Sequence, residues 1–154
     1  MDSSPYDSPQ MPHTYTSILV HVVFSTKERR RQITDDIQTR LWAYMGGIAR
    51  TNDFKALSIG GTDDHVHALL SIPARISIAK AVQLIKGGSS KWIHDDLAQK
   101  AFEWQECYGA FTIGVAQLDE TIRYIECQRE HHAKWDYEKE MKMILKRHGI
   151  VGTM

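Results

Sequence analysis

Two histidines separated by one residue, His65 and His67, stand in a segment that otherwise has the composition of a buried strand, GTDDHVHALLSIP. Side chains alternate along a strand, so both imidazoles lie on one face, about 6 to 7 Å apart. At this spacing they can share one metal ion if an oxygen ligand from elsewhere completes the site. The alternative is a surface pair on a half-exposed sheet, which the spacing alone would favour. Asp63 fits a turn, and Asp64 fits either the turn or an acceptor that orients an imidazole.

A tyrosine in the segment DETIRYIECQREHH is the second group that could do chemistry. Tyr124, Gln128 and His131 recur at i, i+4 and i+7 beside an apolar stripe, so a nucleophile and an amide ligand could face one site from one helix. The alternative is that Tyr124 packs its ring at the edge of the core and leaves its hydroxyl in water. No chemistry is assigned to His131 or His132, and His21 is interpreted as a core or sheet histidine.

The elements around these groups follow the order βαββαβ, with two more helices after it. Strands are predicted at 15–24, 54–59, 65–72 and 102–113, and helices at 34–51, 78–93, 119–132 and 136–147. This order predicts an α+β fold, a ferredoxin-like or RRM-like antiparallel sheet with its first two helices on one face, plus a C-terminal helix bearing the tyrosine. Val66, Ala68, Leu70 and Ile72 should lie beneath those two helices, and the histidines on the opposite face.

The chain has 154 residues, which suits one domain, here placed at 14–150 after a loose tail at 1–13. Nineteen basic and nineteen acidic residues cancel, so any polyanion site must be local. Local basic groups occur at 27–31 and at Lys80, Lys86 and Lys91, although such runs are usually solvated faces. The two cysteines, Cys107 and Cys127, are expected to be reduced, and no signal core or spanning run is visible, so we expect a soluble cytoplasmic protein without a membrane partner.

Five segments, taken in order and spacing, carry a resemblance to a known family: HVVFSTKERRR, DDHVHALLSIP, KGGSSKWI, WQECYGAFTIG and YIECQREHH. From about residue 17 to 149 the chain resembles the short single-tyrosine transposases of bacterial insertion sequences, the HUH class, including the REP-associated tyrosine transposases. The resemblance implies cleavage and rejoining of single-stranded DNA at hairpin-bearing element ends, through a 5′-phosphotyrosine intermediate and without a nucleoside triphosphate.

The resemblance also implies roles for particular residues. Tyr124 is the nucleophile, and His65, His67 and Gln128 are ligands of a divalent metal, Mg²⁺ or Mn²⁺. Relatives form homodimers in which the tyrosine helix of one subunit can complete the site of the other. Phosphates favour cations, hydroxyls and helix-end amides. The DNA contacts are therefore expected from Lys27, Arg29, Arg30, Arg31, Lys86, Ser89, Ser90 and Lys91.

Two other functions stay open at this point. The first is a domesticated endonuclease that processes chromosomal repeats with the same residues and the same chemistry. The second is a non-catalytic module that binds single-stranded nucleic acid, although the histidine face offers few aromatic residues for base stacking.

Overall fold

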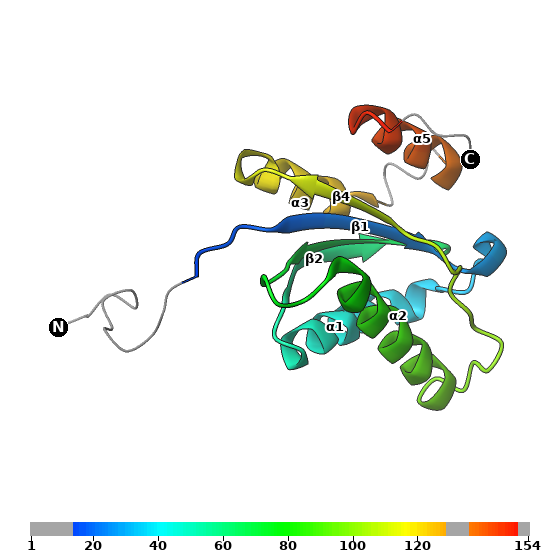
Figure 1. The fold of residues 1–154 in the computed structure, drawn as a ribbon. Helices are drawn as coiled ribbons and strands as arrows, with labels where there is room; N and C mark the ends of the chain where they lie inside the picture. The colour runs from blue at the N-terminus through cyan, green and yellow to red at the C-terminus, as the bar shows by residue number, and fades with distance from the viewer. Residues whose placement is uncertain (1–13, 129–135, 151–154) are drawn as a thin grey trace, which may run out of the picture.

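The structure, a computed structural model, describes residues 14–128 and 136–150, and its elements follow the predicted order. Figure 1 shows the strands as the centre of the molecule, with helices on both sides. The strands are β1 (Leu19–Ser25), β2 (Lys55–Gly61), β3 (His65–Ser71) and β4 (Gly109–Ile113). The helices are α1 (Asp35–Thr51), α2 (Ile78–Asp95), α3 (Leu118–Glu126) and α5 (Tyr137–Arg147), with short 3-10 turns η1 (Lys27–Arg29) and η2 (Val115–Gln117).

The four strands form one antiparallel sheet in the order β2-β3-β1-β4. Directly opposite residues of an antiparallel pair share a face. The register places Val23 opposite His67 and His21 opposite Leu69, so His21 lies on the same face as the two histidines of β3. The predicted α+β fold is therefore correct, and the two central strands supply the histidine face.

The first side of the sheet packs on α1 and α2, as the strand alternation predicted. Val66, Ala68, Leu70 and Ile72 are buried there among side chains of both helices. The predicted cap of α2 is also present, because the Ser77 hydroxyl accepts a hydrogen bond from the Lys80 N–H at 3.0 Å. This layer is the main hydrophobic core and the base on which β3 rests.

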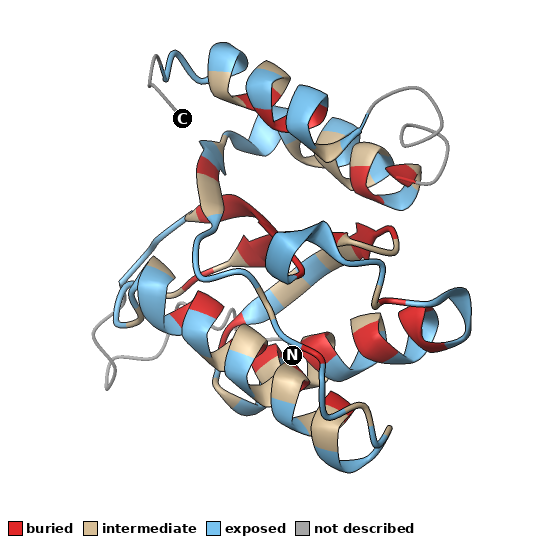
Figure 2. Cartoon of the chain, turned by 90° about the vertical axis from the view of Figure 1, so that its right-hand side faces the viewer, coloured by how far each residue is buried: buried red, intermediate tan, exposed pale blue. Residues whose placement is uncertain are grey.

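The second side of the sheet is not half-exposed, because α3 and α5 cover it (Figures 1 and 2). Val23, Phe111, Met141 and Ile144 form a smaller buried cluster beneath α5. Helix α3 lies close against β2 at Gly60, where a Cβ atom would stand 2.5 Å from the backbone oxygen of Ile125. The histidine face is therefore an interior layer between the sheet and these two helices.

Other predictions are refined or fall outside the described residues. Only 109–113 of the fourth predicted strand is regular, and Trp104 forms a single bridge with Thr26. The tail at 1–13 and the pair His131 and His132 lie outside the described ranges. None of the helices within the described ranges has both the length and the apolar character that a membrane span needs.

Candidate metal centre and tyrosine site

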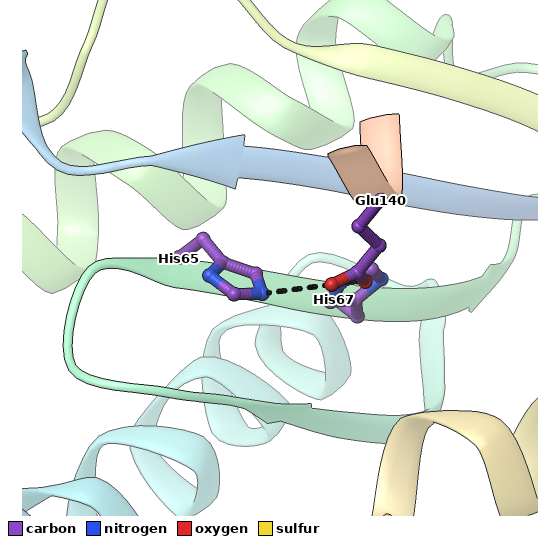
Figure 3. Close-up of side chains that lie close together, drawn as sticks. All are labelled: His65, His67 and Glu140. Atoms are coloured by element: carbon purple, nitrogen blue, oxygen red, sulfur yellow. Dashed lines mark ion pairs between the residues drawn. The ribbon is translucent and has the colours of Figure 1, made fainter. Parts of the chain in front are cut away.

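Three buried side chains converge between the sheet and α5: His65 and His67 from β3, and Glu140 from α5 (Figure 3). Nε2 of His67 lies 2.5 Å from Oε1 of Glu140, and Nε2 of His65 lies 3.6 Å from Oε2 of the same carboxylate. One donor atom from each residue falls within 4.8 Å of the others. Two imidazoles and a carboxylate in this arrangement fit a divalent cation.

The second nitrogen of each imidazole is held by a polar neighbour. Nδ1 of His65 lies 2.7 Å from Oδ1 of Asp64 and 3.0 Å from the hydroxyl of Thr62. Nδ1 of His67 lies 2.8 Å from Nε2 of His21. Both Nε2 atoms are consequently directed at Glu140, the orientation that outer partners impose on metal-binding histidines. Of the two interpretations of Asp64, the structure favours the one in which it orients an imidazole.

Tyr124 and Gln128 reach the same place from α3 and the residues that follow it. The Tyr124 hydroxyl donates a hydrogen bond of 2.7 Å to Oε1 of Glu140, and its ring lies edge-on to the ring of His67, with centroids 5.6 Å apart. Oε1 of the buried Gln128 lies 3.3 Å from Nε2 of His65. The four residues predicted as nucleophile and ligands thus meet within one chain.

Burial and hydrogen bonding act in opposite directions on the pKa values of this cluster. Burial alone would lower the pKa of His65, but the hydrogen bonds with Asp64 and Glu140 raise it to about 9. Burial would raise the pKa of Glu140, but hydrogen bonds with His65 and His67 hold it well below its ordinary value. Burial and the proximity of His67 lower the pKa of His21 to about 3. The site therefore holds the Glu140 carboxylate next to a protonated His65 imidazole. A metal cation that binds there would replace the proton of that imidazole.

The same carboxylate affects the tyrosine. Burial, and then the hydrogen bond to Glu140, raise the pKa of Tyr124 above its ordinary value. The hydroxyl is therefore protonated at neutral pH, with its proton directed at a carboxylate oxygen. A phenol in this state needs an acceptor for its proton and an activated electrophile before it can react.

Glu140 is the functional residue that sequence reasoning missed. It lies on the apolar face of α5, next to Met141 and four residues before Ile144, and its side chain is 3 % exposed. A carboxylate within a buried stripe requires a compensating partner. That mismatch between residue type and position is the signal in the sequence that points to Glu140. His21 is a sheet histidine, as interpreted, but it also contacts His67.

The predicted basic loop lies beside the histidine strand. The backbone N–H of Ile33 donates a hydrogen bond of 2.9 Å to the carbonyl of Asp63. The backbone N–H of Thr26 donates one of the same length to the carbonyl of Asp64. All four predicted cations of the loop have a carboxylate within 4.0 Å: Lys27 with Glu103, Arg29 with Glu138, Arg30 with Glu28 and Arg31 with Asp63. These exposed pairs are weak and can exchange for phosphates.

The predicted residues of α2 lie on the other side of the sheet. The Lys86 ammonium donates to the carbonyl of Gln105 at 2.5 Å, and burial lowers its pKa. Ser89 is buried, and its hydroxyl donates to the carbonyl of Ile85 at 2.6 Å. Ser90 is half-buried and Lys91 is exposed. The structure thus brings the loop at 27–31 to the site, and it does not bring the α2 residues there.

Known proteins resemble this chain in sequence and in fold. The family model described as "Transposase IS200 like" matches residues 14–128. Transposases for insertion sequence element IS200 from Salmonella typhimurium and Salmonella typhi are each 24% identical over 129 residues, covering 80% of this chain and 85% of theirs.

Two solved structures share the fold. A proposed transposase of Deinococcus radiodurans R1 has a TM-score of 0.60 at 23% identity, over 77% of this chain and 97% of its own. A REP-associated tyrosine transposase bound to a REP hairpin has a TM-score of 0.59 at 15% identity, over 81% of this chain and 74% of its own. At these identities the likeness concerns the fold.

Proposed function

This chain belongs to the IS200-like transposase family, and we propose that it cleaves and rejoins single-stranded DNA through a covalent bond between Tyr124 and a 5′ phosphate. The observation that carries the proposal is the contact of the Tyr124 hydroxyl, at 2.7 Å, with the carboxylate that also contacts both histidines. A nucleophile, a proton acceptor and a set of metal ligands therefore stand within one buried site.

The proposed reaction is a transesterification. The Tyr124 oxygen attacks the phosphorus, and the hydroxyl proton leaves by way of its hydrogen bond to Oε1 of Glu140 and is released to solvent. The bond between phosphorus and the 3′ oxygen breaks, and that oxygen takes a proton from solvent to leave a free 3′ hydroxyl. Attack by a 3′ hydroxyl on the phosphotyrosine reverses these steps and rejoins the strand. The energy of the phosphodiester is retained in the tyrosine ester, so no nucleoside triphosphate is needed.

His65, His67, Gln128 and Glu140 are the proposed ligands of a divalent cation, Mg²⁺ or Mn²⁺. Oxygen ligands suit these ions, while imidazoles would also accept zinc. A bound cation would polarise the phosphate oxygens and offset the charge that develops on them. Asp64 and His21 hold the two imidazole rings in orientation through their Nδ1 atoms.

The proposed substrate is a hairpin with single-stranded flanks, as at the ends of an insertion element. A protein of similar fold binds a REP hairpin, which supports this class of substrate. We assign backbone contacts to Lys27, Arg29, Arg30 and Arg31, since their loop adjoins the turn before His65. Contacts from Lys86, Ser90 and Lys91 would need the DNA to pass along α2 as well, and the buried Ser89 hydroxyl would have to leave its bond to Ile85.

The remaining parts of the proposal concern assembly and location. We propose a single domain at 14–150 that acts as a homodimer in the cytoplasm. The two edge strands, β2 and β4, are available for pairing between subunits. Because Tyr124, Gln128 and the two histidines meet within one chain, each subunit could act in cis, and exchange of α3 between subunits would give the trans arrangement.

The test is a denaturing gel of a labelled hairpin taken from the flanks of the gene, incubated with Mg²⁺ or Mn²⁺. Wild-type protein should give a metal-dependent covalent adduct that Tyr124→Phe cannot form. Tyr44→Phe is the matched control, because Tyr44 is partly exposed on α1 and stacks on Trp92 on the other side of the sheet. Cleavage that survives Tyr124→Phe would refute the mechanism, and binding without cleavage would indicate a non-catalytic module.

A further inference from the structure

We propose that a cavity between α3 and α5 binds one nucleotide of single-stranded DNA adjacent to the scissile phosphate, with Arg123 and Arg147 as its phosphate contacts. The proposal rests on the proposed function and deepens it, because it assigns the path of the strand beyond the reacting phosphorus.

The cavity has a volume of about 490 Å³, within the range of sites that hold small molecules. His21 lines it from β1, Tyr124 and Arg123 line it from α3, and Ile144 and Arg147 line it from α5. Its walls combine apolar side chains, which suit a base or a sugar, with cationic groups, which suit a phosphate.

Tyr124 joins this cavity to the candidate metal centre. Its hydroxyl bonds Glu140 in that centre, and its ring stands edge-on to the His21 ring, with centroids 6.2 Å apart. A phosphate attacked by this hydroxyl is bonded to a nucleotide on each side. Since His65, His67 and Glu140 are buried, the strand needs an open space next to the tyrosine, and this cavity is such a space.

The charge around the cavity suits an anion. Arg123 and Arg147 are exposed, and within the described ranges neither forms an ion pair, whereas the cations at 27–31 all have a carboxylate within 4.0 Å. Glu120 is the carboxylate among the lining residues, and neutral polar groups come from Gln117 and Thr121 beside the imidazole of His148. The backbone carbonyls of 144–146 accept hydrogen bonds from the N–H groups of 148–150, so the end of α5 is satisfied internally.

The two cysteines of the chain provide a direct readout. Cys127 lines this cavity, and the exposed Cys107 lines a different one beside β4. The experiment measures the alkylation rate of each thiol by peptide mass spectrometry, in Tyr124→Phe protein with Mn²⁺, with and without the single-stranded probe hexathymidylate. We expect the probe to slow alkylation of Cys127 more strongly than that of Cys107, whose cavity is lined by the proposed DNA contact Arg29.

Charge variants test the phosphate contacts. Arg123→Gln and Arg147→Gln should each weaken hexathymidylate binding about tenfold, as for loss of one hydrogen bond to a charged group. Each should also reduce the slope of log affinity against log salt by about 0.7. Arg147→Lys should retain most of the affinity. Arg40→Gln, which removes the same charge from an exposed position of α1, should change neither quantity.

The outcomes separate this inference from the proposed function. An unprotected Cys127, or protection that persists unchanged in both glutamine variants, would overturn the inference even if the wild-type protein forms the tyrosine adduct on its hairpin. Protection that both glutamine variants abolish would support the inference, and would do so even if no adduct formed and the transesterification mechanism failed.

Discussion

Replacing Glu140 by glutamine should weaken metal binding while leaving the shape of the site unchanged. The variant keeps the volume and an oxygen that can accept the Tyr124 hydrogen bond, but it removes the negative charge near both Nε2 atoms. Loss of a group that only supports a ligand typically costs 10- to 100-fold in metal affinity. Because this carboxylate is buried and belongs to the ligand set itself, we expect a loss of about 100-fold, the upper end of that range.

That loss translates into a difference in thermal stability. At a free Mn²⁺ concentration about 100 times the wild-type Kd, binding stabilises the fold by about 2.7 kcal/mol, while a variant bound 100-fold more weakly gains only about 0.4 kcal/mol. For a protein of this size the midpoint should rise by about 5 to 10 °C in the wild type and by about 1 to 2 °C in Glu140→Gln.

The assay is a pair of thermal unfolding curves for each protein, one in EDTA and one in Mn²⁺, with calorimetric titration to obtain Kd. Glu138→Gln is the matched control, because it removes the same charge two residues away on α5, where the carboxylate is exposed and lies 3.9 Å from Lys142. It should behave as the wild type. If Glu140→Gln binds Mn²⁺ as tightly as the wild type and shows the same rise in midpoint, Glu140 is not a ligand.

Two further changes test the support of the site. His21→Phe keeps a ring but removes the nitrogen 2.8 Å from Nδ1 of His67, so Mn²⁺ affinity should fall about 10- to 100-fold by the same titration; unchanged affinity would exclude a role in orienting the ring. Gly60→Ala would place a Cβ 2.5 Å from the backbone oxygen of Ile125, and it should destabilise the fold in urea by about 1 to 3 kcal/mol. Gly46→Ala is the control, because no atom lies within 4 Å of the added Cβ, and it should stabilise α1 by about 0.5 to 1 kcal/mol. Equal effects of the two substitutions on the free energy of unfolding would contradict the close packing at Gly60.

The sequence predicted the strands and the face of the histidines because both follow from local alternation, whereas the antiparallel sheet was predicted from the order of the elements. Val66, Ala68 and Leu70 are apolar at every second position, and only one face of β3 could pack against α1 and α2. Helical spacing also predicted that Tyr124 and Gln128 face one site, although the helix predicted at 119–132 ends at Glu126 and Gln128 reaches His65 from just beyond it. These patterns extend over fewer than ten residues, and nothing distant in the chain was needed to interpret them.

The burial of the histidines could not be predicted in that way, because it depends on α3 and α5, which come after β4 in the chain. Strand alternation gives the face on which His65 and His67 lie, and it does not say whether water or a helix covers that face. Spacing on α5 could have shown that Glu140 is buried with Met141, yet the partner of that carboxylate depends on how the helix crosses the sheet.

A buried carboxylate is costly when unpaired, and so are two buried imidazoles that lack partners. Placed together, Glu140 and the histidines satisfy one another and give α5 a polar anchor within an otherwise apolar contact. The residues that would bind the cation therefore also position the helix that covers the site. It follows that the metal and α5 should be coupled: a bound cation should hold this helix on the sheet, and loss of the carboxylate should loosen the helix and weaken the site at once.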